Sequence, residues 1–213
     1  MNENRQNIIC ATEHLLQTHG LARLTTRKIA RKAGVAEGLI YHHFKDKAEL
    51  IYEVVEQRMS DAKNVLQSLP LKVGLRTLSE NLEAVLSALY HSHYEIVPII
   101  CSVFADNQLR ARMQAIMKER EIDPQQAIGE LAAYLAAEQR LGRVAGSVIP
   151  QAAAKCLWMI SIQTAMDDQL MEQKPSAARI RKDISQYVQT MMAGLEPHSP
   201  ARQKKTLKKS KKS

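Results

Sequence analysis

The side chains with the clearest pattern for polar chemistry lie between Thr25 and Lys47, in the run TTRKIARKAGVAEGLIYHHFKDK. Hydroxyl, guanidinium, ammonium and imidazole groups alternate there with apolar residues, so donors suited to anionic groups sit over a small core. Gly34 stands in the middle of the run, where a helix that ends in a left-handed residue favours glycine. The spacing therefore predicts two short helices joined by a tight turn.

The first of these helices begins at a threonine cap, Thr25 or Thr26, and basic residues fill the face opposite its apolar positions. The second runs from residue 37 to 43 or 44, with Ile40 and Phe44 four positions apart and facing inward. Its other face is polar and points outward, where it could enter the major groove of DNA. Asp46 then opens a further helix, and Glu49 three residues later completes a capping-box pattern.

The run resembles the DNA-binding head of the TetR family of one-component repressors, over roughly residues 8–55. The likeness rests on LTTRKIA, the turn glycine and GLIYHHFKDKAEL, which occur in register. Beyond residue 55 only the layout is similar, an all-helical body that ends in two helices. The resemblance implies an all-α fold of about nine helices, with a helix-turn-helix DNA-binding domain at 1–47, an effector-binding and dimerisation domain at 48–196, and a tail at 197–213.

The resemblance also implies which residues contact DNA. Thr26 and Arg27 match positions that hold phosphate or reach a base, and Tyr41 and Lys47 match phosphate contacts. The base-facing positions are Glu37, Gly38, Leu39, His42 and His43.

Three features of the head bear on how it would read DNA. Ala36 stands where the family commonly has a serine cap, which weakens that cap by about 1 kcal/mol. Leu39 stands where threonine is common, so we expect apolar contact with a thymine methyl group. Glu37 suits the positive end of its helix, and either accepts from a cytosine amine or points along the groove. A head that kept its core and lost DNA affinity is the alternative, disfavoured because the exposed positions are still basic and polar.

Charge and composition favour a nucleic-acid partner. The 213 residues carry a net charge of +8, with 8 basic and 4 acidic residues in 1–47, and 7 basic and no acidic residues in 197–213. The tail is expected to be disordered, either as a solubilising extension or as a source of sequence-independent DNA affinity. No apolar run predicts a membrane span or a signal peptide, so we expect no membrane partner and a cytoplasmic, nucleoid-associated protein.

The rest of the chain reads as successive helices. The first is expected at 4–18 and the fourth at 47–68, followed by helices at 74–91 and 94–105, a long helical stretch at 107–140 that restarts or kinks at Asp123-Pro124, and helices at 150–171 and 177–194. The last two are apolar on more than one side, and in the resembled family such a pair forms the dimer interface. A homodimer through these two helices is therefore predicted.

The family's effector cavity would lie among the helices of the body. Candidates to line it, chosen as adaptable Met, aromatic and polar residues, are Phe104, Met113, Met117, Tyr134, Trp158, Met159 and Gln163. Ordinary core packing is the competing interpretation for each. The three cysteines are odd in number and far apart, and are expected to be small buried side chains. His91 and His93 point about 200° apart on a helix, so no metal site is predicted.

The sequence therefore predicts a sequence-specific transcriptional regulator, a repressor that binds a palindromic operator as a dimer and is released by an apolar or amphipathic small molecule. No catalytic residue and no cofactor is predicted, because the chain has no phosphate loop, nucleophile elbow or ligand cluster. The alternatives are a helical interaction protein with a vestigial head, and an activator of the same fold.

Overall fold

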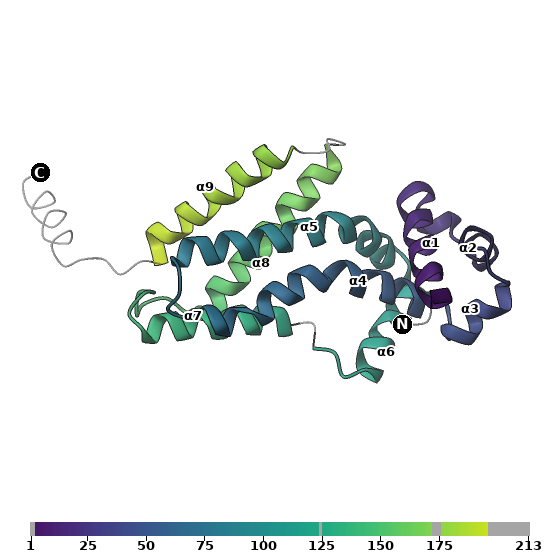
Figure 1. Cartoon of the computed structure of the whole chain (residues 1–213), viewed down its shortest axis with the longest axis horizontal. Helices are drawn as coiled ribbons and strands as arrows, with labels where there is room; N and C mark the ends of the chain where they lie inside the picture. The colour runs from purple at the N-terminus through teal and green to yellow at the C-terminus, as the bar shows by residue number, and fades with distance from the viewer. Residues whose placement is uncertain (1–2, 124, 172–175, 196–213) are drawn as a thin grey trace, which may run out of the picture. The chain divides into compact units, whose positions relative to one another are not determined.

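The computed structural model describes residues 3–123, 125–171 and 176–195, and these residues confirm the predicted all-α fold. They form nine α-helices and two short 3-10 helices (Figure 1). In chain order these are α1 Glu3–His19, η1 Leu21–Arg23, α2 Thr26–Ala33, α3 Glu37–His43, α4 Lys47–Gln67, η2 Leu69–Lys72, α5 Leu78–Ala105, α6 Asn107–Glu119, α7 Gln126–Arg140, α8 Pro150–Leu170 and α9 Ala177–Leu195. The predicted tail, 197–213, lies outside the described residues.

The segment from residue 78 to 105 is one helix, so the prediction of two helices at 74–91 and 94–105 was wrong. Ser92 and His93, which fall at the predicted break, are buried, and the buried stripe continues beyond them through Ile96. Pro98 lies inside the helix rather than in a first turn. Burial against other helices therefore keeps this polar stretch helical, although the sequence pattern predicts that the helix ends there.

α5 also begins four residues later than predicted, because Thr77 caps it. The Thr77 amide donates to Glu80 Oε2 at 2.9 Å, and the Glu80 amide donates to Thr77 Oγ1 at 3.2 Å. This reciprocal pair is a capping box. Gly74, where the helix was expected to start, has φ of +74° and belongs to the preceding turn.

The long stretch at 107–140 forms two helices. α6 ends near Glu121, which has a left-handed φ of 53°. The Ile122 amide donates to the Met117 carbonyl at 2.9 Å and closes the helix end. α7 then begins at Gln126, so the predicted restart at this point is confirmed as a full break, while Pro124 itself lies outside the described residues.

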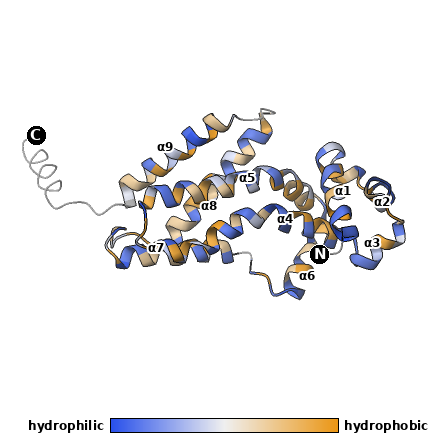
Figure 2. Ribbon diagram, in the orientation of Figure 1, coloured by the Kyte–Doolittle hydropathy of each residue, from blue (hydrophilic) through white to orange (hydrophobic). Residues whose placement is uncertain are grey.

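The described chain divides into two compact units. The first is built from the described residues of Met1–Asp61, His91–Pro124 and Ala165–Gln173, and the second from those of Ala62–Tyr90, Gln125–Thr164 and Lys174–Ser213. Apolar and polar residues alternate along the helices, so most helices have one apolar face to bury (Figure 2).

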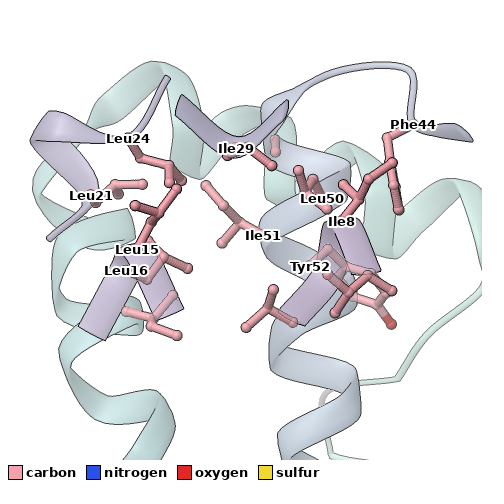
Figure 3. Close-up of a cluster of buried hydrophobic side chains, with 14 of the residues drawn as sticks. Ile8, Leu15, Leu16, Leu21, Leu24, Ile29, Phe44, Leu50, Ile51 and Tyr52 are labelled. Atoms are coloured by element: carbon pink, nitrogen blue, oxygen red, sulfur yellow. The ribbon is translucent and has the colours of Figure 1, made fainter. Parts of the chain in front are cut away.

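The first unit has a core shared by α1–α4 and by residues of α5 and α6. Ile8, Ile29, Leu50 and Ile51 are fully buried in it, and Figure 3 shows them converging between the helices with Phe44. The second unit has its own buried side chains, which include Leu66, Leu69, Leu82, Leu86, Leu89, Leu131, Leu135, Leu157 and Val188.

The cysteine prediction was wrong. Cys10, Cys101 and Cys156 are all exposed in the chain, because each lies on the outward side of its helix. Among the described residues, no helix is long and apolar enough to cross a membrane.

His93 gives a testable pH dependence. Burial lowers the pKa of His93 from the usual 6.5 to about 4. The unfolded chain therefore binds this proton at higher pH than the folded chain, so acid favours unfolding. We expect the free energy of unfolding to fall by roughly 3 kcal/mol from this residue as the pH drops from 6.5 to 4.

Urea unfolding of wild type and His93→Leu at several pH values across this range measures the effect. The variant should lose this part of the pH dependence. His91→Leu, a matched change at an exposed position of the same helix, should keep it. An unchanged pH dependence in His93→Leu would contradict the assignment.

Candidate nucleic-acid interface

The turn between α2 and α3 reverses the chain through Gly34. This residue has φ of 69° and ψ of 32°, the left-handed conformation that glycine adopts at little steric cost. The Val35 amide donates to the Ala30 carbonyl at 3.0 Å and closes α2. At the other end, the Thr25 hydroxyl accepts from the Lys28 amide at 3.3 Å. The predicted helix-turn-helix is confirmed in both its cap and its turn.

α3 buries one face and exposes the other. Ile40 and the following Phe44 are 2% and 1% exposed, so they anchor the helix to the core of the first unit. Tyr41 is 58% exposed, and Glu37, Gly38 and His42 are exposed as well. Two predicted base-facing residues, Leu39 and His43, are half-buried. The helix thus presents a polar outer face on a fixed apolar base.

Three of the predicted DNA-contacting residues are joined by hydrogen bonds. The Thr26 hydroxyl, at the start of α2, donates to Glu37 Oε1 in the first turn of α3 at 2.5 Å. The Tyr41 hydroxyl donates to Thr26 Oγ1 at 3.4 Å. The sequence analysis named all three residues and missed their contact, because nothing in the local pattern shows that residues 11 and 15 positions apart meet.

This contact changes the interpretation of Glu37. Its carboxylate accepts from a hydroxyl of the same head and lies in the first turn of α3, where the positive end of the helix favours it. Both interactions reduce its repulsion of a nearby phosphate. Ala36, the residue before it, makes no side-chain cap, as the sequence predicted. Glu37 therefore supplies part of the electrostatic stabilisation that a serine cap would give.

The start of α4 is closely capped. Asp46 Oδ1 accepts from the Glu49 amide at 2.9 Å, and Glu49 Oε2 accepts from the Lys45 amide at 2.6 Å. The predicted capping motif is therefore present, except that the Glu49 side chain bonds the amide of Lys45 rather than the amide of the capping residue Asp46. Burial raises the pKa of Asp46, but hydrogen bonds from Arg112 and backbone amides outweigh it and hold this pKa below its usual value. Asp46 is thus a carboxylate when it caps α4.

Lys47 lies at this same helix start and is half-buried. Its Nζ donates to the Leu21 carbonyl at 3.4 Å, which places the ammonium group beside η1. Burial lowers the pKa of Lys47, and the charge of Asp106 partly opposes that shift. On α2, the exposed side chains of Arg27, Arg31 and Lys32 add positive charge to the head.

The predicted effector-lining residues fall in both compact units. In the first unit, Met113 is buried in the core, Met117 packs against that core, and Phe104 is 62% exposed. In the second, Tyr134 is buried and its hydroxyl accepts from Asn81 Nδ2 at 2.9 Å.

The other three candidates lie on α8, in the second unit. Trp158 is partly buried, while Met159 and Gln163 are exposed on one face of the helix. The assignment of all seven residues to an effector site stays a prediction. The described residues contain no group of three or more His, Cys, Asp or Glu placed to hold a metal ion.

Comparison with known proteins finds similarity over the head. Residues 8–54 match the family described as bacterial regulatory proteins, tetR family. The nucleoid occlusion factor SlmA of Aliivibrio fischeri is 26% identical over 138 residues, which cover 59% of this chain and 67% of that protein. An HTH-type transcriptional regulator of Staphylococcus aureus is 36% identical over 55 residues, which cover 26% of this chain and only 30% of that regulator.

Solved structures match over most of the chain. A protein of Mesorhizobium loti described as a TetR-family transcriptional regulator has a TM-score of 0.72 and 17% identity, and the match covers 92% of this chain and 99% of that one. FadR of Bacillus subtilis, solved in complex with stearoyl-CoA, has a TM-score of 0.63 and 18% identity, with coverages of 86% and 96%. At these identities the likeness establishes the fold.

The position of Lys47 gives a testable prediction about DNA. We expect Lys47→Ala to weaken binding to all duplex sequences to a similar degree, because a phosphate contact carries no base information. The slope of log affinity against log salt concentration should become shallower by about 0.9, the value for one lost phosphate contact. Fluorescence anisotropy with duplex DNA over a range of salt concentrations measures both quantities.

The matched control is Lys155→Ala, which removes an exposed lysine from α8. It lowers the net charge by the same amount and should leave the slope unchanged. Equal slopes for the two variants would show that Lys47 acts only through net charge.

Proposed function

Because residues 8–54 of this chain belong to the tetR family of bacterial regulatory proteins, we propose that the protein is a repressor that binds a palindromic operator as a homodimer and leaves it when a small molecule binds. Its coarser description, a DNA-binding transcriptional regulator with the TetR-type fold, follows from the family match and the fold. The observation that carries the proposal is the exposed polar face of α3 on its buried base. Such a protein acts at the nucleoid, in the cytoplasm.

The size and chemistry of α3 suit a major groove. An α-helix with its side chains is about 10–12 Å in diameter, which fits a major groove about 12 Å wide, and the seven residues of α3 extend about 10 Å along it. Glu37, Gly38 and His42 face outward, so they can reach base edges. Thr26 and Lys47, at the starts of the neighbouring helices α2 and α4, are proposed to bind phosphates.

A homodimer is supported by an exposed apolar stripe on α8. In the second unit, Ala152, Cys156 and Met159 are exposed on α8 and follow one another at intervals of four and three residues. This spacing places them on one helix face and is typical of helices that pack against a partner helix. Met159 is 56% exposed, and on α9 Tyr187 is 37% exposed, so both of the last two helices offer apolar surface.

The effector is proposed to be an amphipathic molecule with a long apolar part. Of the solved proteins with this fold, FadR of Bacillus halodurans is described as a fatty acid degradation regulator, and FadR of Bacillus subtilis was solved with stearoyl-CoA. Met113 and Met117 on α6, which are buried in the core of the first unit or packed against it, have adaptable side chains that suit an acyl chain. Fatty acyl compounds are therefore the first class to test.

Ion pairs between α6 and α4 provide a route from an effector to the head, within the first unit. Arg112 Nε lies 2.6 Å from Asp46 Oδ2, the carboxylate that caps α4. Arg120 lies 2.6 Å from Glu49 and 2.7 Å from Glu53, in the first two turns of the same helix. A shift of α6 would pull directly on the start of α4, beside Lys47. We propose that effector binding acts through this contact.

The proposal is tested by selecting random duplex DNA on the purified protein near physiological salt. The expected result is an enriched two-fold palindrome, which Tyr41→Ala combined with Lys47→Ala does not bind. Met159→Glu places a charge in the exposed stripe of α8. It should give a monomer by light scattering that binds the palindrome at least tenfold more weakly, because only one half-site is held.

Fatty acyl-CoA compounds of several chain lengths are then added to the complex with the selected palindrome. Release of the DNA by one of them supports the effector class, and transcription from a promoter carrying the palindrome should rise with the same compound. No enriched sequence would contradict the proposal, and so would a palindrome that Met159→Glu binds as tightly as wild type while still dimeric.

Arg120 tests the contact between α6 and α4. Arg120→Gln removes both ion pairs to α4, and we expect the free energy of unfolding to fall by about 1 kcal/mol, a modest value because the guanidinium is partly exposed. Arg110→Gln is the matched control, since Arg110 Nη2 bonds within α6, to Asn107 at 2.9 Å. Urea unfolding compares the two. An equal loss of unfolding free energy in both variants would show that the ion pairs to α4 stabilise the protein no more than the bond within α6 does.

A further inference from the structure

Three leucines are exposed together in the second unit. Leu71 is 80% exposed, Leu75 is 59% exposed and Leu141 is 56% exposed. Two segments carry them, η2 with the turn after it and the end of α7, and η2 packs against α7. A Cβ atom added at Gly74, next to Leu75, would lie 3.2 Å from Leu141 Cδ1. We call Leu71, Leu75 and Leu141 the leucine face.

Buried polar contacts hold the leucine face in place. Glu138 is fully buried, accepts from the Gly74 amide at 3.2 Å and pairs with Arg143 at 3.1 Å. Arg143 Nη2 donates to the Arg76 carbonyl at 2.5 Å. Asn81 Nδ2 donates to the Leu75 carbonyl at 3.0 Å. These bonds tie the turn that carries Leu75 to α5 and α7, so its exposure is a fixed property of the fold.

The surroundings of the leucine face are basic. Residues 68–80 and 138–149 contain four basic residues, Lys72, Arg76, Arg140 and Arg143, and two acidic residues, Glu80 and the buried Glu138 that pairs with Arg143. Arg76 and Arg140 are exposed, and Lys72 is partly exposed. Glu80 accepts from the Thr77 hydroxyl and amide in the capping box, which occupies one of its carboxylate oxygens. Basic residues therefore outnumber acidic residues around the leucines.

A hollow beside the leucine face extends this basic surface to α9. It has a volume of about 630 Å³ and is lined by Gly74, Arg76, Thr77, Leu78, Ser79, Arg143 and Met192. Met192 is near the end of α9, so the hollow brings Arg76 and Arg143 beside this helix.

We propose that the leucine face is a binding surface for an anionic phospholipid bilayer. Protruding leucines can insert among lipid headgroups and acyl chains, while the surrounding arginines and lysines bind the negative headgroups. Such association takes place at the membrane surface and needs no spanning helix. The strength of such binding increases with the apolar area inserted and with the electrostatic attraction to anionic lipids.

Other partners explain less of this surface. Nucleic acid would use the arginines and leave three leucines in water. A peptide helix needs an apolar groove, but the hollow beside the leucines is lined largely by arginine, hydroxyl and glycine residues. Leu71 projects from the surface instead of lining a groove, which suits insertion into a fluid boundary.

The test uses the full chain and sedimentation with vesicles, either of phosphatidylcholine alone or of phosphatidylcholine mixed with phosphatidylglycerol. Wild type should bind the anionic vesicles and leave the neutral vesicles largely unbound. Leu71→Ser, Leu75→Ser and Leu141→Ser combined should weaken binding about tenfold or more, because the inserted apolar surface is lost. Met171→Ser, at a methionine that is 71% exposed elsewhere in the chain, should bind as wild type does.

Two further measurements on the triple variant decide between explanations. Its circular dichroism and its binding to duplex DNA should match wild type, which shows that the fold and the head are intact. Equal binding of anionic vesicles by wild type and triple variant would overturn the proposal, as would wild-type binding that does not depend on phosphatidylglycerol. A change of oligomeric state in the triple variant would show that a second copy of the chain covers the leucine face, and would also overturn it.

Discussion

The burial of α4 side chains in the core of the head is the constraint on which the first unit depends. Leu50 and Ile51 are fully buried among residues of α1, α2 and α3, and Val54 is 1% exposed. α4 is therefore part of the head's own core as well as the helix that continues into the body. Any displacement of its first turns must move α3 or open this core, and open packing costs several kcal/mol.

Polar contacts around the start of α4 also join this helix to a neighbouring helix. Glu49 accepts from the Lys45 amide with one oxygen and pairs with Arg120 through the other. Asp46 likewise divides its two oxygens between the Glu49 amide and Arg112. Each carboxylate thus joins the cap of α4 to α6. The contacts that stabilise the helix end are also those that a movement of α6 would disturb.

The second unit has two exposed apolar surfaces of different character. The stripe on α8 is a helix face with regular spacing and few charges, which suits a second helix. The leucine face is short and has basic residues around it, which suits an anionic surface. The two surfaces differ in the backbone that carries them. The stripe lies on a long helix, whereas the leucine face lies on turns that hydrogen bonds to Glu138 and Asn81 hold in place.

The sequence by itself determined the features that depend on neighbouring residues. The left-handed Gly34, the inward pair Ile40 and Phe44, the cap at Asp46 and the missing cap at Ala36 follow from helix periodicity and end chemistry, which act over three or four residues. Only the tertiary structure decided what depends on distant residues. The bond from Thr26 to Glu37, the pairing of Arg112 with Asp46, the unbroken α5 and the exposed cysteines all follow from packing, because a side chain's surroundings are set by segments that the local pattern cannot locate.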